Sequence, residues 1–480
     1  MRRSFGIWIL WAVAAGLASP AVAEGQTPLP AGTETILVKG GPELQVIPMV
    51  SDSLIAFVER TEVSGEVVIW YRDLAAGSEL KMIPTVADVR DVLLGVSGTR
   101  ILFERRAMAS PERSTLLFDT ASQTLTELVP PSADTTRTIR GYALAGENVA
   151  LLQSSTSPLE FNVGVLSVND QTITWLTHES ATERQNGIHG VSLGSDGNSL
   201  AWQRCEVVPG SGVSCTMRLS RKDADGNWGP GEIVAEGAHG MQGFDADGSL
   251  VAWSAVNGDS FDLQYRYFPD GALTTVEMPE SWEGLPRVSG PFVAFNQSQH
   301  SITSRDLYVL DTRSGALYAV TNTAEREEYL SDLHYDETSG DLWLGWNTSS
   351  VNEQDVDAWV MRIPFGARHT VRPLFRHEHA YRQGAVVPIR LQLLDATGVN
   401  VSSSSLVLTA TGLVHKDSTA APLVVEDAGN SNPDDTFRYD AALQGYAFNL
   451  SAKGLASGTW ELRFRAGANS REYAITFDVR

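Results

Sequence analysis

The sequence predicts an all-β protein: a seven-bladed β-propeller followed by a smaller β-sandwich. Three observations predict this fold. A turn followed by a short apolar strand recurs along residues 33–364. The strands between these turns alternate apolar with polar residues, are rich in β-branched types, and leave no long amphipathic helix. The repeat stops near Pro364, where a second β pattern begins.

The repeat is measured at one apolar position in the strand after each turn. Successive positions are 46, 48, 51, 51, 42 and 50 residues apart. They are Ile55, Ile101, Val149, Leu200, Val251, Val293 and Trp343. Four short strands in a period of about 45 residues are typical of a propeller blade. The last unit is incomplete, so we predict that residues 33–38 supply the outer strand of the seventh blade and close the ring.

Two units resemble the "PDGxxIAF" segment of TolB-like β-propeller repeats. Their sequences are Asp196-Gly197-Asn198-Ser199-Leu200-Ala201-Trp202 and Asp247-Gly248-Ser249-Leu250-Val251-Ala252-Trp253. Both lack the proline that precedes this segment in the family. The resemblance covers residues 45–364 and implies a TolB-like propeller.

A second domain is predicted at residues 385–480, after a linker at 365–384, and its strand spacing suits a β-sandwich. It resembles the PxKF domain of secreted bacterial proteins. The motif stands at Pro388-Ile389-Arg390-Leu391, with Arg for Lys and Leu for Phe, and the family's later run matches Phe437-Arg438-Tyr439-Asp440, Tyr446, Asn449-Leu450, Lys453-Gly454-Leu455 and Gly458-Thr459. The resemblance implies an immunoglobulin-like extracytoplasmic module of bacterial origin and no catalytic activity.

The N-terminus predicts export. Arg2 and Arg3 precede an apolar run at residues 5–18, and Ala21-Val22-Ala23 forms a cleavage site. Together these features indicate a signal peptide at residues 1–23. The run is shorter than the roughly 20 residues of a membrane span, and no later stretch is apolar for 18 residues. We therefore expect a secreted or periplasmic protein with no membrane span.

The two cysteines support the same compartment. Cys205 and Cys215 flank a turn at Pro209-Gly210, so they are expected on facing strands of a hairpin. In an oxidising compartment this arrangement predicts a local disulfide.

The charge balance limits the class of partner. The chain has 58 acidic and 36 basic side chains, a net charge of −22. This excess of acid argues against a nucleic-acid partner, whose phosphates need a basic face. We expect a protein or glycan partner in the cell envelope or outside the cell.

We predict no catalytic residues, no metal and no cofactor. The sequence has no G-x-S-x-G elbow and no S-x-x-K beside its partner motifs. The segment His377-Glu378-His379 lacks a third ligand, so it predicts a polar linker strand rather than a metal site.

The candidate ligand-binding residues share one position in the repeat. Arg90, Arg140, His189 and His239 stand shortly before the first strand of blades two to five, and His334 stands in the corresponding stretch of blade seven. The first four would lie at one mouth of the central channel. There they would bind an anion, hold a divalent metal, or simply bond to backbone and channel water.

The predicted function is recognition. We expect a non-catalytic binding or scaffold protein that uses a propeller face for protein or glycan recognition. The alternative is a polysaccharide-acting, lyase-like enzyme with its site at the channel mouth. A purely structural stalk is the third interpretation, and it needs no chemistry in the channel.

Overall fold

The structure is a computed structural model. It describes residues 26–40, 43–60, 67–74, 79–110, 112–130, 137–156, 158–180, 187–208, 212–237, 243–257, 260–276, 278, 281–299, 305–323, 326–337, 339–350, 356–366, 369–376, 380–394, 398–404, 406–416, 423–425, 428, 435–467 and 472–480. These residues form strands, turns and loops without a helix, which confirms the all-β prediction. None of them forms a helix long and apolar enough to cross a membrane. The predicted signal peptide at 1–23 lies outside the described residues.

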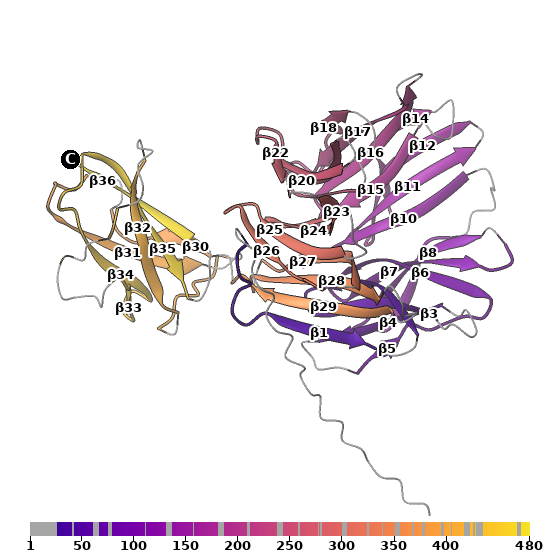
Figure 1. Cartoon of the computed structure of the whole chain (residues 1–480), viewed down its shortest axis with the longest axis horizontal. Helices are drawn as coiled ribbons and strands as arrows, with labels where there is room; N and C mark the ends of the chain where they lie inside the picture. Colours follow the sequence, from indigo (N-terminus) through magenta and orange to yellow (C-terminus); the bar gives the residue numbers. More distant parts are fainter. Residues whose placement is uncertain are drawn as a thin grey trace, which may run out of the picture.

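The larger lobe is a β-propeller built from four-stranded antiparallel groups (Figure 1). In the groups formed by strands β2 to β26, neighbouring strands in the sheet are also consecutive along the chain. Each group begins with its innermost strand and continues outward. The first group consists of β2 (Leu44–Ser51), β3 (Leu54–Arg60), β4 (Val67–Asp73) and β5 (Lys81–Met82). The second consists of β6 (Val89–Ser97), β7 (Arg100–Ala107), β8 (Arg113–Asp119) and β9 (Thr124–Val129).

The next three groups follow the same plan. The third consists of β10 (Arg137–Ala145), β11 (Asn148–Thr156), β12 (Leu159–Ser167) and β13 (Ile173–Trp175), and β14 (Glu179–Ser180) also pairs with β12. The fourth consists of β15 (Gly187–Leu193), β16 (Ser199–Val208), β17 (Gly212–Arg221) and β18 (Glu232–Gly237). The fifth consists of β19 (Phe244–Asp247), β20 (Leu250–Asn257), β21 (Ser260–Tyr267) and β22 (Thr274–Val276).

The last two groups are joined by a single parallel bridge between Arg305 and Glu327. The sixth consists of β23 (Ser281–Ser289), β24 (Phe292–Gln299), β25 (Arg305–Asp311) and β26 (Ala316–Ala319). The seventh consists of β27 (Arg326–Tyr335), β28 (Asp341–Ser350), β29 (Val356–Pro364) and β1 (Glu34–Lys39).

The N-terminal strand completes the seventh group. β1 pairs antiparallel with β29, with Glu34 opposite Arg362. The predicted pairing of the segment at 33–38 with the last strands is therefore confirmed. The seventh group also packs tightly on the first, since a Cβ atom added to Gly345 would lie 2.4 Å from the carbonyl oxygen of Pro48. Glycine is required here because the two backbones approach so closely.

Apolar side chains fill the spaces between neighbouring groups. One cluster joins Ala56 and Ile69 of the first group to Ile101 and Phe103 of the second, and all four are fully buried or nearly so. These side chains are buried on both faces of each sheet. Their burial stabilises the fold by roughly 25 cal/mol per Å² of apolar surface. Each group is thus stable only in contact with its neighbours.

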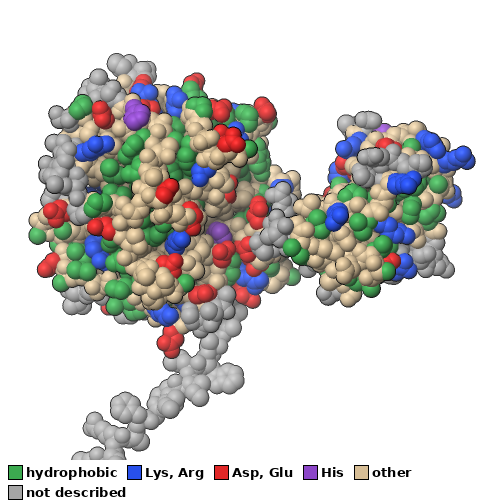
Figure 2. Space-filling view, turned by 180° about the vertical axis from the view of Figure 1, so that it is seen from behind, with side chains coloured by type: hydrophobic (Ala, Val, Ile, Leu, Met, Phe, Trp, Pro, Cys, Tyr) green, Lys and Arg blue, Asp and Glu red, His purple; other side chains and the backbone are tan. Residues whose placement is uncertain are grey.

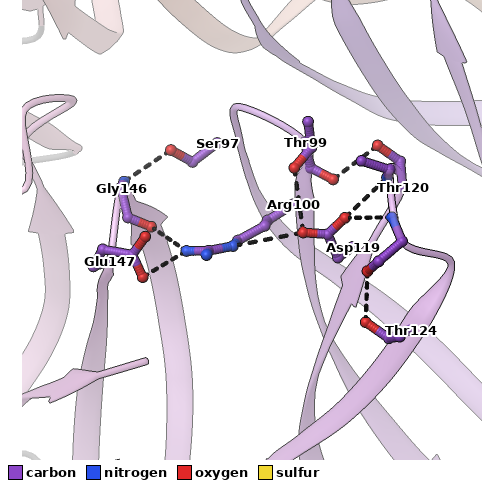
Figure 3. A network of polar contacts seen from close by, with 10 residues as sticks. Ser97, Thr99, Arg100, Asp119, Thr120, Thr124, Gly146 and Glu147 are labelled. Carbon is purple, nitrogen blue, oxygen red and sulfur yellow. Dashed lines mark hydrogen bonds and ion pairs between the residues drawn. The ribbon is translucent and has the colours of Figure 1, made fainter. Parts of the chain in front are cut away.

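Polar contacts tie the ends of the groups together. At one end of the inner strands, Gly98 N donates to Ser51 Oγ (3.0 Å) and Gly146 N donates to Ser97 Oγ (2.8 Å), in each case across two groups. Nearby, Arg100 of the second group forms an ion pair with Glu147 of the third at 2.7 Å (Figure 3). Neighbouring turns are therefore held in register by hydrogen bonds as well as by packing.

The predicted disulfide is present. Cys205 on β16 lies directly opposite Cys215 on β17, with a Cα–Cα distance of 4.0 Å. Both cysteines are buried. The bond links the two central strands of the fourth group.

The C-terminal lobe stands apart from the propeller (Figure 1). Its two antiparallel sheets enclose a single hydrophobic core, with Phe448 of one sheet and Phe464 of the other both fully buried. One sheet has the order β30 (Thr370–Pro373), β31 (Val386–Leu394), β34 (Gly445–Ser451) and β33 (Arg438–Asp440). The other has the order β32 (Leu408–His415), β35 (Gly458–Ala466) and β36 (Glu472–Val479).

The region 365–384, expected as a linker, is divided between the lobes. Phe365 is buried in a propeller cluster with Phe292, and their ring centroids lie 4.4 Å apart. Val371 on β30 packs against the C-terminal core, and Tyr381 forms a bridge with Val479. Apolar side chains at these positions anchor the ends of the segment because they bury surface that a solvated linker would expose.

Candidate functional site

The inner strands share an irregularity near the propeller axis. The pairing register shifts within β2, β6, β10, β15, β23 and β27. Such bulges redirect the side chains that follow them. The first paired residue after the shift lines the axial cavity in five of these strands: Met49, Gly95, Ala143, Arg287 and Asp332. The bulges thus help to decide which side chains face the axis.

The axial cavity has a volume of about 230 Å³ and receives residues from the inner strand of all seven groups. Most of its lining is apolar or small, from residues such as Val50, Leu144 and Phe244. Its acidic, basic and imidazole side chains are Asp245, Arg287, Asp332 and His334. A closed ring of strands therefore surrounds a small cavity with two carboxylates and a guanidinium at its wall.

Asp245 is held by three donors. Its carboxylate accepts hydrogen bonds from Ser192 Oγ, from Val288 N at 2.8 Å and from Ala246 N at 2.9 Å. Burial in the protein raises the pKa of Asp245, and the nearby positive charge of Arg287 opposes this rise. The bond to Val288 crosses from the fifth group to the sixth, so this carboxylate also fixes the spacing of two inner strands.

Asp332 has a similar role where the seventh group meets the first. Its Oδ2 accepts from Val50 N at 2.9 Å and its Oδ1 accepts from Leu333 N at 3.0 Å. Burial raises the pKa of Asp332 to about 6, again against the opposing charge of Arg287. Both aspartates keep some accessible surface although protein surrounds them, because they face the cavity.

The guanidinium of Arg287 is positioned by hydrogen bonds to two backbone carbonyl groups. Its Nε donates to Ser331 O at 2.9 Å and its Nη1 donates to Pro286 O at 3.2 Å. The guanidinium influences Asp245 and Asp332 through space, and no ion pair within 4.0 Å joins it to either carboxylate. With both aspartates ionised, this trio has a net charge of −1.

A wider depression adjoins the axial cavity and shares Ser195 and His334 with it. Its volume is about 800 Å³, and turns that follow inner strands form much of its wall. Its acidic residues are Asp52, Asp196, Asp247, Asp336 and Glu337. The only arginine in its lining is Arg313, which forms a two-bond pair with Asp311 at 2.8 and 2.7 Å. The described lining of the depression is therefore predominantly negative.

Two of these acids show how the wall is organised. Asp52 Oδ1 lies 2.8 Å from His334 Nε2, and this hydrogen bond lowers the pKa of Asp52. Asp247 accepts from Ser195 Oγ at 2.7 Å and from Gly290 N at 2.6 Å, while burial raises the pKa of Asp247. Asp196, by contrast, is exposed on its turn.

The four candidate ligand-binding residues from the sequence either lie away from the two hollows or are not described in full by the structure. Arg90 is exposed near the start of β6. Arg140 lies on β10, and its Nε is buried without a hydrogen-bond partner. His189 lies at the bulge of β15, but its side chain is not among the described features. His239 and the segment 377–379 lie outside the described residues.

Neither Arg90 nor Arg140 lines the axial cavity or the depression. Both precede the cavity-lining residues of their strands, and a strand advances about 3.3 Å per residue toward the turn that follows it. The cavity lies at the turn end, so strand-start residues lie farther from it. His334 is the residue of the sequence-derived set that lines both hollows. The described residues contain no group of three or more His, Cys, Asp or Glu suited to a metal ion.

Sequence reasoning missed the central trio. Asp245, Arg287 and Asp332 are not among the residues selected from the sequence. The sequence offers no clear signal for them, since other inner strands also contain charged residues, such as Asp91 on β6 and Glu283 on β23. The bulges that turn these residues toward the axis are not visible in the sequence.

Comparisons with known proteins add little to this site. The scan against protein-family models finds no match, and no curated protein matches the sequence significantly. Solved structures do show propeller likenesses. The β-propeller domain of the Trilobed protease from Pyrococcus furiosus is 11% identical with a TM-score of 0.49, over 67% of this chain and 94% of that one.

Two further structures are similar at the same level. A prolyl endopeptidase is 12% identical with a TM-score of 0.48, and the match covers 74% of this chain but 54% of the peptidase. TolB from Acinetobacter baumannii is 13% identical with a TM-score of 0.36, over 64% of this chain and 78% of that one. These likenesses are too weak to transfer an activity to this chain.

Proposed function

We propose that this chain is an exported binding or scaffold protein of the bacterial cell envelope or surface. In this proposal the larger lobe is a TolB-like propeller of seven blades, one for each four-stranded group. The C-terminal lobe is a PxKF-type, immunoglobulin-like module that acts as a spacer or an attachment. The ligand is a protein segment that presents a basic group to the propeller.

The observation that carries this proposal is that the wider depression adjoins the axial cavity and shares Ser195 and His334 with it. Turns from several groups form the wider depression, and the axial cavity beyond it contains two carboxylates that face its interior. An ammonium or guanidinium group entering this path would meet carboxylates at the wall and then near the axis. The electrostatic attraction would be greatest at low salt, since the outer acids are solvated.

The compartment is supported by the disulfide between Cys205 and Cys215. Disulfides persist in oxidising compartments such as the periplasm and the exterior of the cell. The predicted signal peptide at 1–23 supports the same proposal from the sequence.

The test uses the mature full chain and trilysine as the cationic probe. We expect trilysine to raise the unfolding temperature, with a smaller effect at high salt. At 100 times its dissociation constant, a ligand adds about 2.7 kcal/mol to stability. The variant Asp196→Asn with Asp336→Asn removes two charges from the depression and should weaken binding at least fivefold.

A charge-matched control is available at the opposite ends of the blades. Glu112→Gln with Glu206→Gln removes two charges from hairpins between second and third strands, and trilysine binding should not change. Failure of trilysine to bind, or equal losses in both double variants, would contradict the proposal. Binding of oligogalacturonate that requires Arg140 and His189 would instead favour the lyase-like alternative.

A further inference from the structure

The four-stranded sheet of the C-terminal lobe has two chemically different faces. Val387, Ile389, Leu391 and Leu393 on β31 are fully buried against the core. The side chains between them, including Arg390, point to the other face because successive side chains alternate across a strand. This second face is not covered by the lobe's own core.

Register places two more arginines on the same face. Arg372 on β30 is opposite Gln392, which shares the outward phase of Arg390. Arg438 on β33 and Arg390 on β31 are both opposite Ala447, the outward residue of the strand between them. Arg390 and Arg438 are thus two strand spacings apart, roughly 10 Å. We call Arg372, Arg390 and Arg438 the arginine face.

One described acid shares the arginine face: Asp440 lies two residues after Arg438 on β33, and its carboxylate accepts hydrogen bonds from Ala442 N and Leu443 N rather than pairing with an arginine in the described part of the chain. None of the three arginines forms an ion pair there, although Arg390 Nη1 donates to Ile389 O at 2.9 Å. The outer face of the second sheet differs. There Arg463 pairs with Glu472 at 3.4 Å, and Lys416 pairs with Glu461 at 3.5 Å.

The positive charge also contrasts with the rest of the molecule. Residues 24–364 contain 47 acidic and 22 basic side chains, whereas residues 365–480 contain 11 acidic and 12 basic ones. Figure 2 shows basic side chains prominent on the visible side of the C-terminal lobe and acidic ones distributed over the propeller. Three like charges on one sheet face repel one another, and a bound anion would relieve that repulsion.

We propose that the arginine face docks an acidic polysaccharide, with the guanidinium groups binding its carboxylates. A planar guanidinium matches a carboxylate with two parallel hydrogen bonds. Partly exposed apolar side chains on and beside this sheet, Leu374 and Val386, offer surface for the apolar faces of sugar rings. A polymer with one carboxylate per sugar ring suits separated arginines, whereas the chain's net charge of −22 opposes a denser polyanion such as polyphosphate. The site is independent of the propeller site.

The experiment measures binding of polygalacturonate to the mature full chain at several salt concentrations. We expect saturable binding that weakens as salt increases. The variant Arg372→Gln with Arg390→Gln and Arg438→Gln should weaken binding at least tenfold. The matched control Lys416→Gln with Arg463→Gln and Arg465→Gln, on the second sheet, should change it less than twofold. Circular dichroism and thermal unfolding confirm that both variants are folded.

Several outcomes would overturn the proposal. Equal affinity for all three proteins would show that the arginine face does not bind the polymer. Inorganic polyphosphate that binds more tightly and displaces polygalacturonate would assign the face to phosphate instead of carboxylate. Light scattering that shows an oligomer in the parent protein but a monomer in the arginine-face variant would assign it to a second copy of this chain. Asp196→Asn with Asp336→Asn should leave polygalacturonate binding intact, which separates this test from that of the propeller site.

Discussion

The two lobes are both built from β-strands, yet they bury their side chains in different ways. In the C-terminal lobe one cluster unites both sheets. In the propeller, separate clusters lie within and between neighbouring groups, as the one joining the first and second groups shows. The C-terminal lobe therefore fills its centre with apolar side chains. The propeller leaves a hollow at its axis, where charged side chains are accommodated without disrupting packing.

The two lobes also differ in where their charged side chains lie. The propeller gathers acids in the depression that adjoins its axial cavity, while the C-terminal lobe has a sheet face with three arginines outside any described ion pair. The chain's net charge is the sum over two lobes whose surfaces differ in charge. The two lobes would accordingly attract partners of opposite charge.

The largest expected effect tests the single core of the C-terminal lobe. Phe448→Ala should destabilise that lobe by about 3–5 kcal/mol because it removes a fully buried ring that contacts Phe437. In differential scanning calorimetry, one transition should move to lower temperature while the propeller transition stays in place. A uniform shift of all unfolding would show that the lobes unfold as one unit.

The next effect tests the charged axis of the propeller. The pKa of Asp332 is raised from 3.8 to about 6, so the native state binds this proton more tightly than the unfolded state does. Its contribution to stability must fall as pH rises from 4 to 7, by about 2.4 kcal/mol, mostly below pH 6. Chemical denaturation across this range should show that fall in the parent protein relative to Asp332→Asn.

A control separates this behaviour from the titration of other acids. Asp270→Asn removes an exposed turn carboxylate and should leave the pH profile parallel to that of the parent protein. If Asp332→Asn also gives a parallel profile, the carboxylate does not titrate as its burial implies.

The smallest expected effect concerns the surface ties between groups. Arg100→Gln removes the ion pair with Glu147 shown in Figure 3. Both side chains are partly solvated, so we expect a loss below about 1 kcal/mol that decreases further in high salt. Denaturant unfolding at low and high salt measures both. A loss comparable with that of Phe448→Ala would mean that polar ties rather than packing hold the groups together.

The sequence by itself determined the strand content, the repeat, the disulfide pairing and the partner of residues 33–38. Each depends on local information: alternation along a strand, turn residues at regular intervals, or two cysteines across one hairpin. The end of the propeller was less clear because Phe365 and Val371 are anchored by lobes whose cores form only on folding.

Only the tertiary structure decided which residues meet on the axis. Asp245, Arg287 and Asp332 come from three different groups, and no local pattern distinguishes them from other polar strand residues. Side-chain direction has a period of two, so a bulge of one residue inverts every direction that follows it. In β23 and β27 such bulges precede Arg287 and Asp332, and they form where neighbouring strands pack around the ring. The strand pattern alone therefore pointed to Arg90 and Arg140, while the closed ring placed other charges at its centre.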